Sequence, residues 1–167
     1  IIWAEAMAVM QEGRANPRQL YINENTADDF ARLVERIKTT CLKENGYEPL
    51  VIAQLTHSGR YSKPEGKPAP LIAYHCATLE ASNPIDDSRI VTDDYLDRLP
   101  EKFAKAAKLA ENAGFDAIDV KACHQYLLDE LLSAHTREGK YGGSFENRAR
   151  LMIDCFDAVR AVLKPDT

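Results

Sequence analysis

The stretch FDAIDVKACHQYLLDELL, residues 115–132, decides the fold because its hydrophobic pattern changes in the middle. Residues 115–120 form a short, mostly apolar run that is typical of a β-strand, whereas residues 127–132 repeat apolar side chains at helical spacing. Four polar or reactive side chains stand between them: Lys121, Cys123, His124 and Tyr126. The pattern predicts a strand, a loop with chemically useful groups, and then a helix.

Two further strand–helix units precede this one. Apolar runs over residues 1–9 and 49–55 predict strands, and their continuity is typical of parallel strands buried on both faces. Helices are expected to follow from Thr26 and from Thr92, and a last helix from Ser144, because each of these residues can act as an N-cap. The chain is therefore predicted to repeat one strand–helix rhythm.

Apolar stripes predict the buried face of each helix. The expected buried positions are Phe30, Leu33, Val34, Ile37 and Cys41 in the first helix, Tyr95, Leu99, Phe103, Ala106 and Ala110 in the second, and Leu151, Cys155, Phe156, Val159 and Val162 in the last. Residues 61–91 contain four prolines and predict a long loop, which in compact domains is usually functional or mobile.

Strand–helix alternation favours an α/β fold with a parallel sheet. The sequence contains no G-x-G-x-x-G fingerprint, which disfavours a dinucleotide-binding doubly wound sheet. A (β/α)8 TIM barrel uses about 30 residues per unit and places its site at the carboxyl ends of the strands. Three units in 167 residues predict part of such a barrel. Because the chain begins with Ile1 and already reads as a strand, we expect an internal piece of a longer protein.

Composition excludes several classes of function. The net charge of −5 argues against nucleic-acid or anionic-membrane binding, and no apolar run approaches the roughly 20 residues that span a bilayer. The N-terminus lacks the basic start of a secretory signal. The four cysteines form no Cys-x-x-Cys pair, so no metal site is expected. We expect them to be reduced thiols in a cytoplasmic protein. The expected partner is a small-molecule substrate, and a homo-oligomer is left open.

The carboxyl ends of parallel strands meet at one edge of a sheet, so the residues there are candidates for a common site. The candidates are Glu5 and Ala6 in the first strand and Gln54 near the end of the second. Gln54 is either a satisfied core amide or a donor–acceptor pair for the edge of a heterocycle. His57 and Arg60 flank a glycine turn, where hydrogen bonding within the loop is the favoured explanation.

The third strand end carries the most reactive groups. His124 and Tyr126 are two apart, so in extended backbone they would point the same way. Such a pair suits polarising a carbonyl and protonating the neighbouring carbon, and Lys121 could add positive charge for an enolate. Ordinary loop positions explain the same residues, and both explanations stay open. A nucleophilic role for Cys123 is disfavoured, and Thr136-Arg137-Glu138 is predicted to be a solvated turn.

The combined motifs resemble the old yellow enzyme family of FMN-dependent NAD(P)H:flavin oxidoreductases. Four of them occur in one order: Gln54-Leu-Thr-His-Ser-Gly-Arg60, Ala113-Gly-Phe-Asp116, His124-Gln-Tyr-Leu-Leu128 and Tyr141-Gly-Gly-Ser-Phe-Glu-Asn-Arg148. The first strand, with Glu5-Ala-Met-Ala-Val9 and Glu12-Gly-Arg14, resembles the family's second barrel strand. The resemblance implies one partial FMN-binding domain over residues 1–167, from barrel strand 2 to the helix after strand 4, without strand 1 or strands 5–8.

The resemblance also implies roles for five residues. Ala6 and Gln54 would border the flavin, and Gln54 would hydrogen-bond its pyrimidine edge. His124 would anchor the substrate carbonyl, Tyr126 would protonate the α-carbon, and Lys121 would contact the substrate. NADH or NADPH would be the reductant. Without the remaining strands, an isolated piece is expected to bind FMN poorly and to be inactive, with two open sheet edges.

Two positions depart from the family pattern. Lys121 stands where the family usually has a histidine, and Gln125 stands where a glycine commonly precedes the tyrosine. The main prediction is ene reduction of an α,β-unsaturated carbonyl. Since relatives with other residues at the first position act on amines, a flavin-dependent amine dehydrogenase or demethylase is an alternative. A non-catalytic half-barrel, acting only as a folding or interaction module, is the alternative outside this class.

Overall fold

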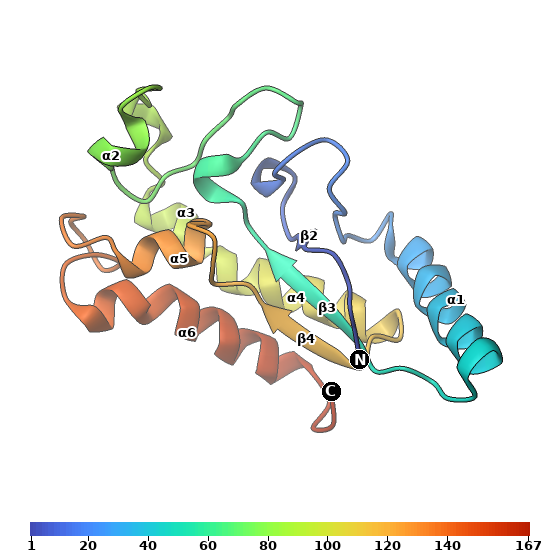
Figure 1. Cartoon of the computed structure of the whole chain (residues 1–167). Coiled ribbons are helices and arrows are strands. Elements are labelled where there is room, and N and C mark those ends of the chain that lie inside the picture. Colours follow the sequence, from blue (N-terminus) through green and yellow to red (C-terminus); the bar gives the residue numbers. More distant parts are fainter.

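Parallel strands form the centre of the computed structural model, which describes residues 1–167 in full (Figure 1). The strands are Ile2–Trp3 (β1), Met7–Ala8 (β2), Val51–Thr56 (β3) and Ala117–Val120 (β4). β3 is the middle strand, with β1 and β2 along one edge and β4 along the other, and every pair is parallel. The predicted parallel α/β architecture is confirmed.

The predicted first strand is interrupted by one extra residue. Trp3 pairs with Ile52 and Met7 pairs with Leu55, so residues 4–6 face only the two residues 53–54. Such a bulge reverses the inward and outward alternation of the side chains that follow it. Met7 consequently points into the helix-covered core, although Trp3 lies on the other face.

Helices cover one face of the sheet, and α4 lies directly behind it in Figure 1. The α-helices are Ala27–Asn45 (α1), Ala77–Glu80 (α2), Asp93–Asp97 (α3), Leu99–Asn112 (α4), Leu127–Leu132 (α5) and Phe145–Val162 (α6). Three short 3-10 helices are Gln11–Gly13 (η1), Gly59–Tyr61 (η2) and Asp87–Arg89 (η3). Leu55, Phe103, Val120 and Leu151 are among the buried residues that join the sheet to α4 and α6.

Local hydrogen bonds explain where the helices begin. Thr92 accepts a bond from the amide of Tyr95 at 3.2 Å, and Ser144 accepts one from the amide of Asn147 at 3.3 Å, so both predicted N-caps are confirmed. Thr26 precedes α1 as predicted, but its hydroxyl donates to the carbonyl of Tyr21 at 2.8 Å instead of capping the helix.

Several predicted boundaries were wrong for identifiable reasons. The predicted second helix is divided into α3 and α4 at Arg98, because Pro100 in the first turn of α4 cannot donate a backbone hydrogen bond. The stretch 61–91 is not a plain loop, since the end of η2 and all of α2 and η3 lie within it. Three predicted core positions are substantially exposed: Leu33 at 38%, Phe156 at 42% and Val162 at 37%.

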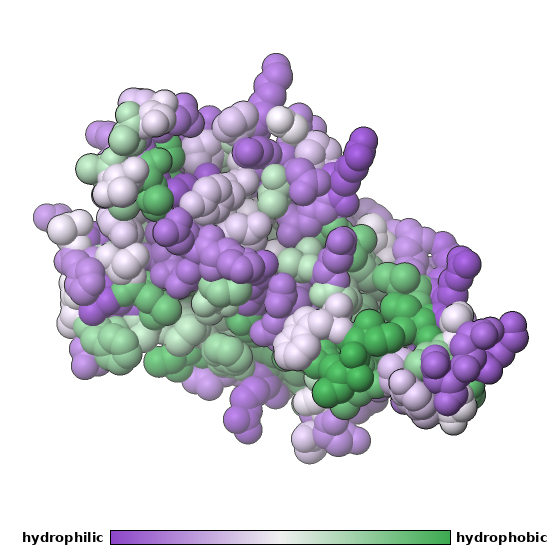
Figure 2. All heavy atoms as spheres, in the orientation of Figure 1, coloured by the Kyte–Doolittle hydropathy of each residue, from purple (hydrophilic) through white to green (hydrophobic).

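The predicted burial of the strands on both faces is confirmed only for the central strand. β3 is buried along its length except for the half-buried Gln54, although no helix covers the near face of the sheet in Figure 1. The edge strand β1 is exposed, and β4 is mostly half-buried. β1 and β4 each pair only with β3, which leaves the two open edges that were expected. Apolar surface also gathers beside α1 at the N-terminal end (Figure 2), where Ile2, Leu33 and Ile37 line one hollow. No helix is long and apolar enough to cross a membrane.

Candidate functional site

The uncovered face of the sheet carries a polar set drawn from three strands. Gln54 on β3 is the direct neighbour of Asp119 on β4, because the two residues are paired in the sheet register. The Gln54 Nε2 atom donates to Asp119 Oδ2 at 2.6 Å, and the Trp3 indole Nε1 donates to the same oxygen at 3.1 Å. Gln54 is therefore held by a carboxylate and is not a buried core amide.

Lys121 continues this set toward the carboxyl edge. Its backbone amide donates to the carbonyl of Leu55 at 2.9 Å, so the residue directly after β4 is still attached to β3. Lys121 lies two residues beyond Asp119, and extended backbone places such residues on the same face of a sheet. Its Nζ atom lies 4.7 Å from the centre of the Tyr126 ring, which is within cation–π range.

The loop between β4 and α5 has an unusual backbone. His124 and Gln125 both adopt positive φ angles, of 63° and 55°, in the left-handed region that L-residues avoid at a cost of roughly 1–2 kcal/mol each. The predicted extended backbone between His124 and Tyr126 was therefore wrong. Their rings nevertheless lie near each other, with centroids 6.3 Å apart in an edge-to-face arrangement. The left-handed turn brings together the two side chains that an extended strand was expected to align.

Tyr61 joins this loop and was not predicted from the sequence. Its ring centroid lies 6.1 Å from that of Tyr126, and its hydroxyl donates to Gln125 Oε1 at 2.7 Å. Gln125 also donates its backbone amide to Asp129 Oδ2 at 2.7 Å. The only signal in the sequence was that Tyr61 closely follows the second strand end, where site residues of parallel sheets gather.

Ala6 lies in the bulge of the first strand. Its carbonyl accepts a hydrogen bond from Gln19 Nε2 at 3.0 Å, and its side chain is half-buried. No hydrogen bond joins Ala6 or Gln54 to His124 or Tyr126. The predicted site residues thus form two groups, one on the sheet face and one in the loop above β4, with Lys121 between them.

His57 belongs to the interior and not to this face. Its Nδ1 atom accepts from the amide of Gly59 at 3.1 Å, which places the proton on Nε2, 2.8 Å from the hydroxyl of Tyr95. Burial lowers the pKa of His57 to about 4, because the charged imidazolium would lose its hydration. The preferred explanation, hydrogen bonding within the loop, is confirmed.

Arg60 is also a structural residue. Its guanidinium contacts two carboxylates, Glu80 at 2.7 Å and the buried Glu130, and donates to the carbonyl of Tyr74 at 2.8 Å. Burial raises the pKa of Glu130, and the neighbouring Arg60 opposes that shift. This cluster joins η2 to Tyr74, to α2 through Glu80 and to α5 through Glu130, so it fixes the long connection against the helix that follows Tyr126.

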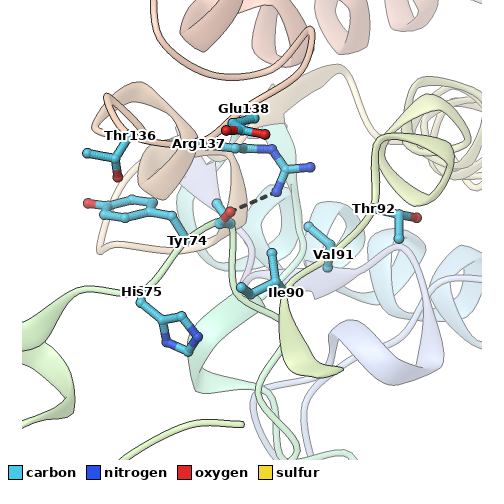
Figure 3. Close-up of a pocket in the computed structure, with 9 residues that line it drawn as sticks. Tyr74, His75, Ile90, Val91, Thr92, Thr136, Arg137 and Glu138 are labelled. Atoms are coloured by element: carbon cyan, nitrogen blue, oxygen red, sulfur yellow. Dashed lines mark hydrogen bonds between the residues drawn. The ribbon is translucent and has the colours of Figure 1, made fainter. Parts of the chain in front are cut away.

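The prediction of a solvated turn was wrong for Arg137. Its side chain is only 7% exposed, and it donates to the carbonyl of Ala73 and to Asp93, each at 2.7 Å. It forms one wall of a cavity of about 490 Å³ whose other walls include His75, Val91 and Glu138 (Figure 3). None of the predicted site residues lines this cavity, whose walls come from residues 73–75, 90–92 and 136–138.

The parallel strands and the helices that connect them define a segment of a parallel α/β barrel, with the candidate site residues toward its carboxyl edge. The chain belongs to the NADH:flavin oxidoreductase / NADH oxidase family, whose model matches residues 1–166. This membership confirms the resemblance to the old yellow enzyme family and the assignment to a partial TIM barrel.

Individual relatives agree with this assignment. The chain is 33% identical over 165 residues to an NADPH dehydrogenase of Bacillus licheniformis, with 97% of the chain and 45% of that relative aligned. The Old Yellow Enzyme from Pichia sp. superposes with a TM-score of 0.76 at 26% identity, covering 98% of this chain and 44% of the other. A morphinone reductase in complex with tetrahydroNAD gives 0.77 at 26% identity, covering 99% and 48%. The chain thus spans about half the length of these relatives.

Proposed function

We propose that residues 1–167 are barrel strands 2–4, with their helices, of an FMN-dependent NAD(P)H oxidoreductase that reduces the activated C=C bond of an α,β-unsaturated carbonyl. The observation that carries this proposal is the continuous row of polar groups from the sheet face to its edge. Gln54 contacts Asp119, Lys121 follows Asp119 by two residues, and Lys121 contacts Tyr126 in the loop that also carries His124. The sheet-face end of this row suits a heterocyclic cofactor and the loop end suits a polar substrate. Family membership supports both the cofactor and the reductant, NADH or NADPH.

The residues present fit one edge of an isoalloxazine ring. Gln54 uses a single N–H toward Asp119, so its Oε1 acceptor and its second N–H remain for a ligand. Ala6 offers a small side chain beside the bulge, which lets a flat ring approach the strand. When bound, FMN supplies the hydride that the reaction requires. The chain's own residues then have to bind, orient and protonate the substrate.

The loop residues divide these tasks by their chemistry. His124 is exposed and offers a ring N–H that can bind the substrate carbonyl oxygen, which polarises the C=C bond conjugated with it. The Tyr126 hydroxyl can give its proton to the α-carbon as a general acid. The Lys121 ammonium, 4.7 Å from the ring centre, favours the negative charge that develops on Tyr126 as its proton leaves.

Substitution of Tyr126 tests the assigned proton donor. In full-length protein loaded with FMN, Tyr126→Phe should slow reoxidation of the reduced flavin by 2-cyclohexenone by about 10²–10⁴-fold, the usual contribution of a general acid. FMN affinity and flavin reduction by NADPH should be unchanged. Tyr47→Phe is the matched control, because Tyr47 is 59% exposed and follows α1, far from the loop. Equal rates in the two variants would contradict the role of Tyr126.

Lys121 is the residue expected to select the substrate. Lys121→His restores the residue that the family usually has, and it should raise turnover on simple enones because imidazole directs its hydrogen bond more sharply than a flexible ammonium. Unchanged or lower turnover would contradict Lys121 as a specificity residue. A full-length flavoprotein reduced by methylamines but not oxidised by enones would instead indicate amine chemistry, and a colourless one would indicate a non-catalytic half-barrel.

A further inference from the structure

We infer that Asp119 is a positioning residue that fixes the orientation of the Gln54 side-chain amide and thereby the kind of ligand edge that this site accepts. The inference rests on the proposed function, because Gln54 is taken to face the flavin. It adds Asp119 to the proposed site residues, with the role of orienting Gln54. Asp119 was not singled out by the sequence, in which it is one of two acidic residues in a mostly apolar predicted strand.

The contact between the two side chains is built into the sheet. Gln54 and Asp119 are register partners on adjacent parallel strands, so their side chains leave the same face next to each other. The separation between Gln54 Nε2 and Asp119 Oδ2 is 2.6 Å, which is short for a hydrogen bond from nitrogen and typical of a charged acceptor. Trp3 donates to the same oxygen from the opposite edge strand. Three strands therefore hold one carboxylate oxygen in place.

An ionised carboxylate can only accept hydrogen bonds, and this property determines which way the amide faces. If the Gln54 amide were flipped, its Oε1 would lie 2.6 Å from Asp119 Oδ2, and two acceptors would repel each other. The amide is therefore held with Nε2 toward Asp119. Oε1 accepts no hydrogen bond from the chain, and one N–H of the amide is also left over.

The remaining acceptor and donor define a complementary ligand. Oε1 requires an N–H donor, and the second N–H of the amide requires a carbonyl oxygen beside it. An imide, in which an N–H is flanked by carbonyl groups, offers this pair, and the pyrimidine part of a flavin contains one. A ligand with an acceptor or a methyl group in place of that N–H would leave Oε1 without a partner, at a cost of the kind expected for unpaired polar groups.

Flavin binding to full-length apoprotein tests this inference. The probes are FMN and N3-methyl-FMN, in which the imide N–H is replaced by N–CH3. The readout is the dissociation constant of N3-methyl-FMN divided by that of FMN, both measured by fluorescence titration. Asp119→Asn keeps the shape of the side chain but offers both a donor and an acceptor, so Gln54 can face either way. We expect FMN to bind about tenfold more weakly, with little change for N3-methyl-FMN, so that the ratio falls by about tenfold.

Asp116→Asn is the matched control. Asp116 lies just before the same strand but at its amino end, where Oδ1 pairs with Lys38 and Oδ2 accepts from the Val51 amide at 2.9 Å. This variant should lower the free energy of unfolding without changing the ratio. If Asp119→Asn does not fold, Trp3→Phe decides, since removing the indole donor loosens the same carboxylate and should also lower the ratio.

The outcomes separate the inference from the proposed function. If the wild-type protein binds neither flavin, the proposed function fails. If the wild type prefers FMN but Asp119→Asn, or Trp3→Phe in its place, keeps the same preference, the positioning role of Asp119 is overturned and the proposed function stands. A fall in the ratio for Asp119→Asn together with an unchanged ratio for Asp116→Asn supports the role.

Discussion

The Nε2 atom of His57 and the hydroxyl of Tyr95 lie 2.8 Å apart in the interior, where a neutral imidazole bridges the end of β3 and the start of α3. Only 1% of His57 is exposed, and its Nδ1 atom already accepts from the Gly59 amide. A proton added to Nδ1 would point at the N–H of the Gly59 amide and break that hydrogen bond. The stability of the fold should therefore depend on pH through His57.

Acid should weaken the folded state through His57. Its folded pKa of about 4 lies below the ordinary value of 6.5, so the unfolded chain binds the proton more readily. The stability that depends on the neutral ring is present above about pH 6.5 and is lost as the pH falls toward 4, by about 3 kcal/mol in total. Urea unfolding of the wild type and of His57→Gln at pH 7.5 and 5.0 measures it, and the variant should lose less stability on acidification.

His75→Gln serves as the control with the opposite sign. Hydrogen bonds to Glu80 and Asp87 raise the pKa of His75, so its contribution is present at low pH and is lost as the pH rises through the raised pKa. Because His75 is 38% exposed, the effect should be small. A His57→Gln protein with the same acid dependence as the wild type would show that another group is responsible.

Gly13 should tolerate no side chain. A Cβ atom there would lie 2.7 Å from His57 Cδ2, and the ring is held on both sides by hydrogen bonds. Gly13→Ala is expected to cost about 1–3 kcal/mol of unfolding free energy, as overpacked interiors do. Gly46→Ala is the comparison, since nothing lies within 4 Å there and only its φ of 80° opposes the change. A smaller loss at Gly13 than at Gly46 would mean that the His57 ring moves aside.

Loss of Arg60 should leave two carboxylates without their cation. Arg60→Met is expected to cost about 3–5 kcal/mol, because Glu130 is only 3% exposed and would stay buried near Glu80. The exposed pair of Arg32 and Asp29 gives the control, with about 0.5 kcal/mol or less lost in Arg32→Met. Thermal unfolding of both variants measures the difference. Equal melting temperatures would contradict the importance of the buried cluster.

At position 125 a glycine variant should be more stable than an alanine variant, which is the reverse of the usual order. Gln125→Gly and Gln125→Ala both remove the bond from Tyr61, so the difference between them reports the backbone alone. At a φ of 55° the glycine variant should be more stable by about 1 kcal/mol, whereas alanine is the more stabilising residue at most positions. Chemical unfolding of the pair measures this, and a more stable alanine variant would show that the turn relaxes out of the left-handed region.

The sequence predicted the features that depend on local chemistry. The parallel strands, the caps at Thr92 and Ser144, and the buried faces built on Phe103 and Leu151 follow from hydrophobic period and cap residues. Gln54, Lys121, His124 and Tyr126 were selected as candidates from their place near strand ends, and their side-chain chemistry suggested general roles. The family resemblance made these roles specific, and they are proposals.

Features that depend on contacts between distant segments were missed. Tyr61 reaches Gln125 only because the turn at Gly59 packs against Leu127, where a Cβ atom would lie 2.8 Å from a backbone nitrogen. Arg137 looked like part of a solvated turn because its partners, Ala73 and Asp93, are more than forty residues away in the chain. Neither contact leaves a periodic signal in the sequence.

The extra residue in the bulge at residues 4–6 sets which side chains of the first strand lie on each face of the sheet. Before it, odd-numbered residues such as Trp3 belong to the open face, and after it, odd-numbered residues such as Met7 and Val9 belong to the core. Deleting any one of the three residues would exchange these faces for the rest of the strand. It would move two large apolar side chains toward the candidate site and remove Ala6 from it, so the spacing of this segment should tolerate substitutions far better than changes in length.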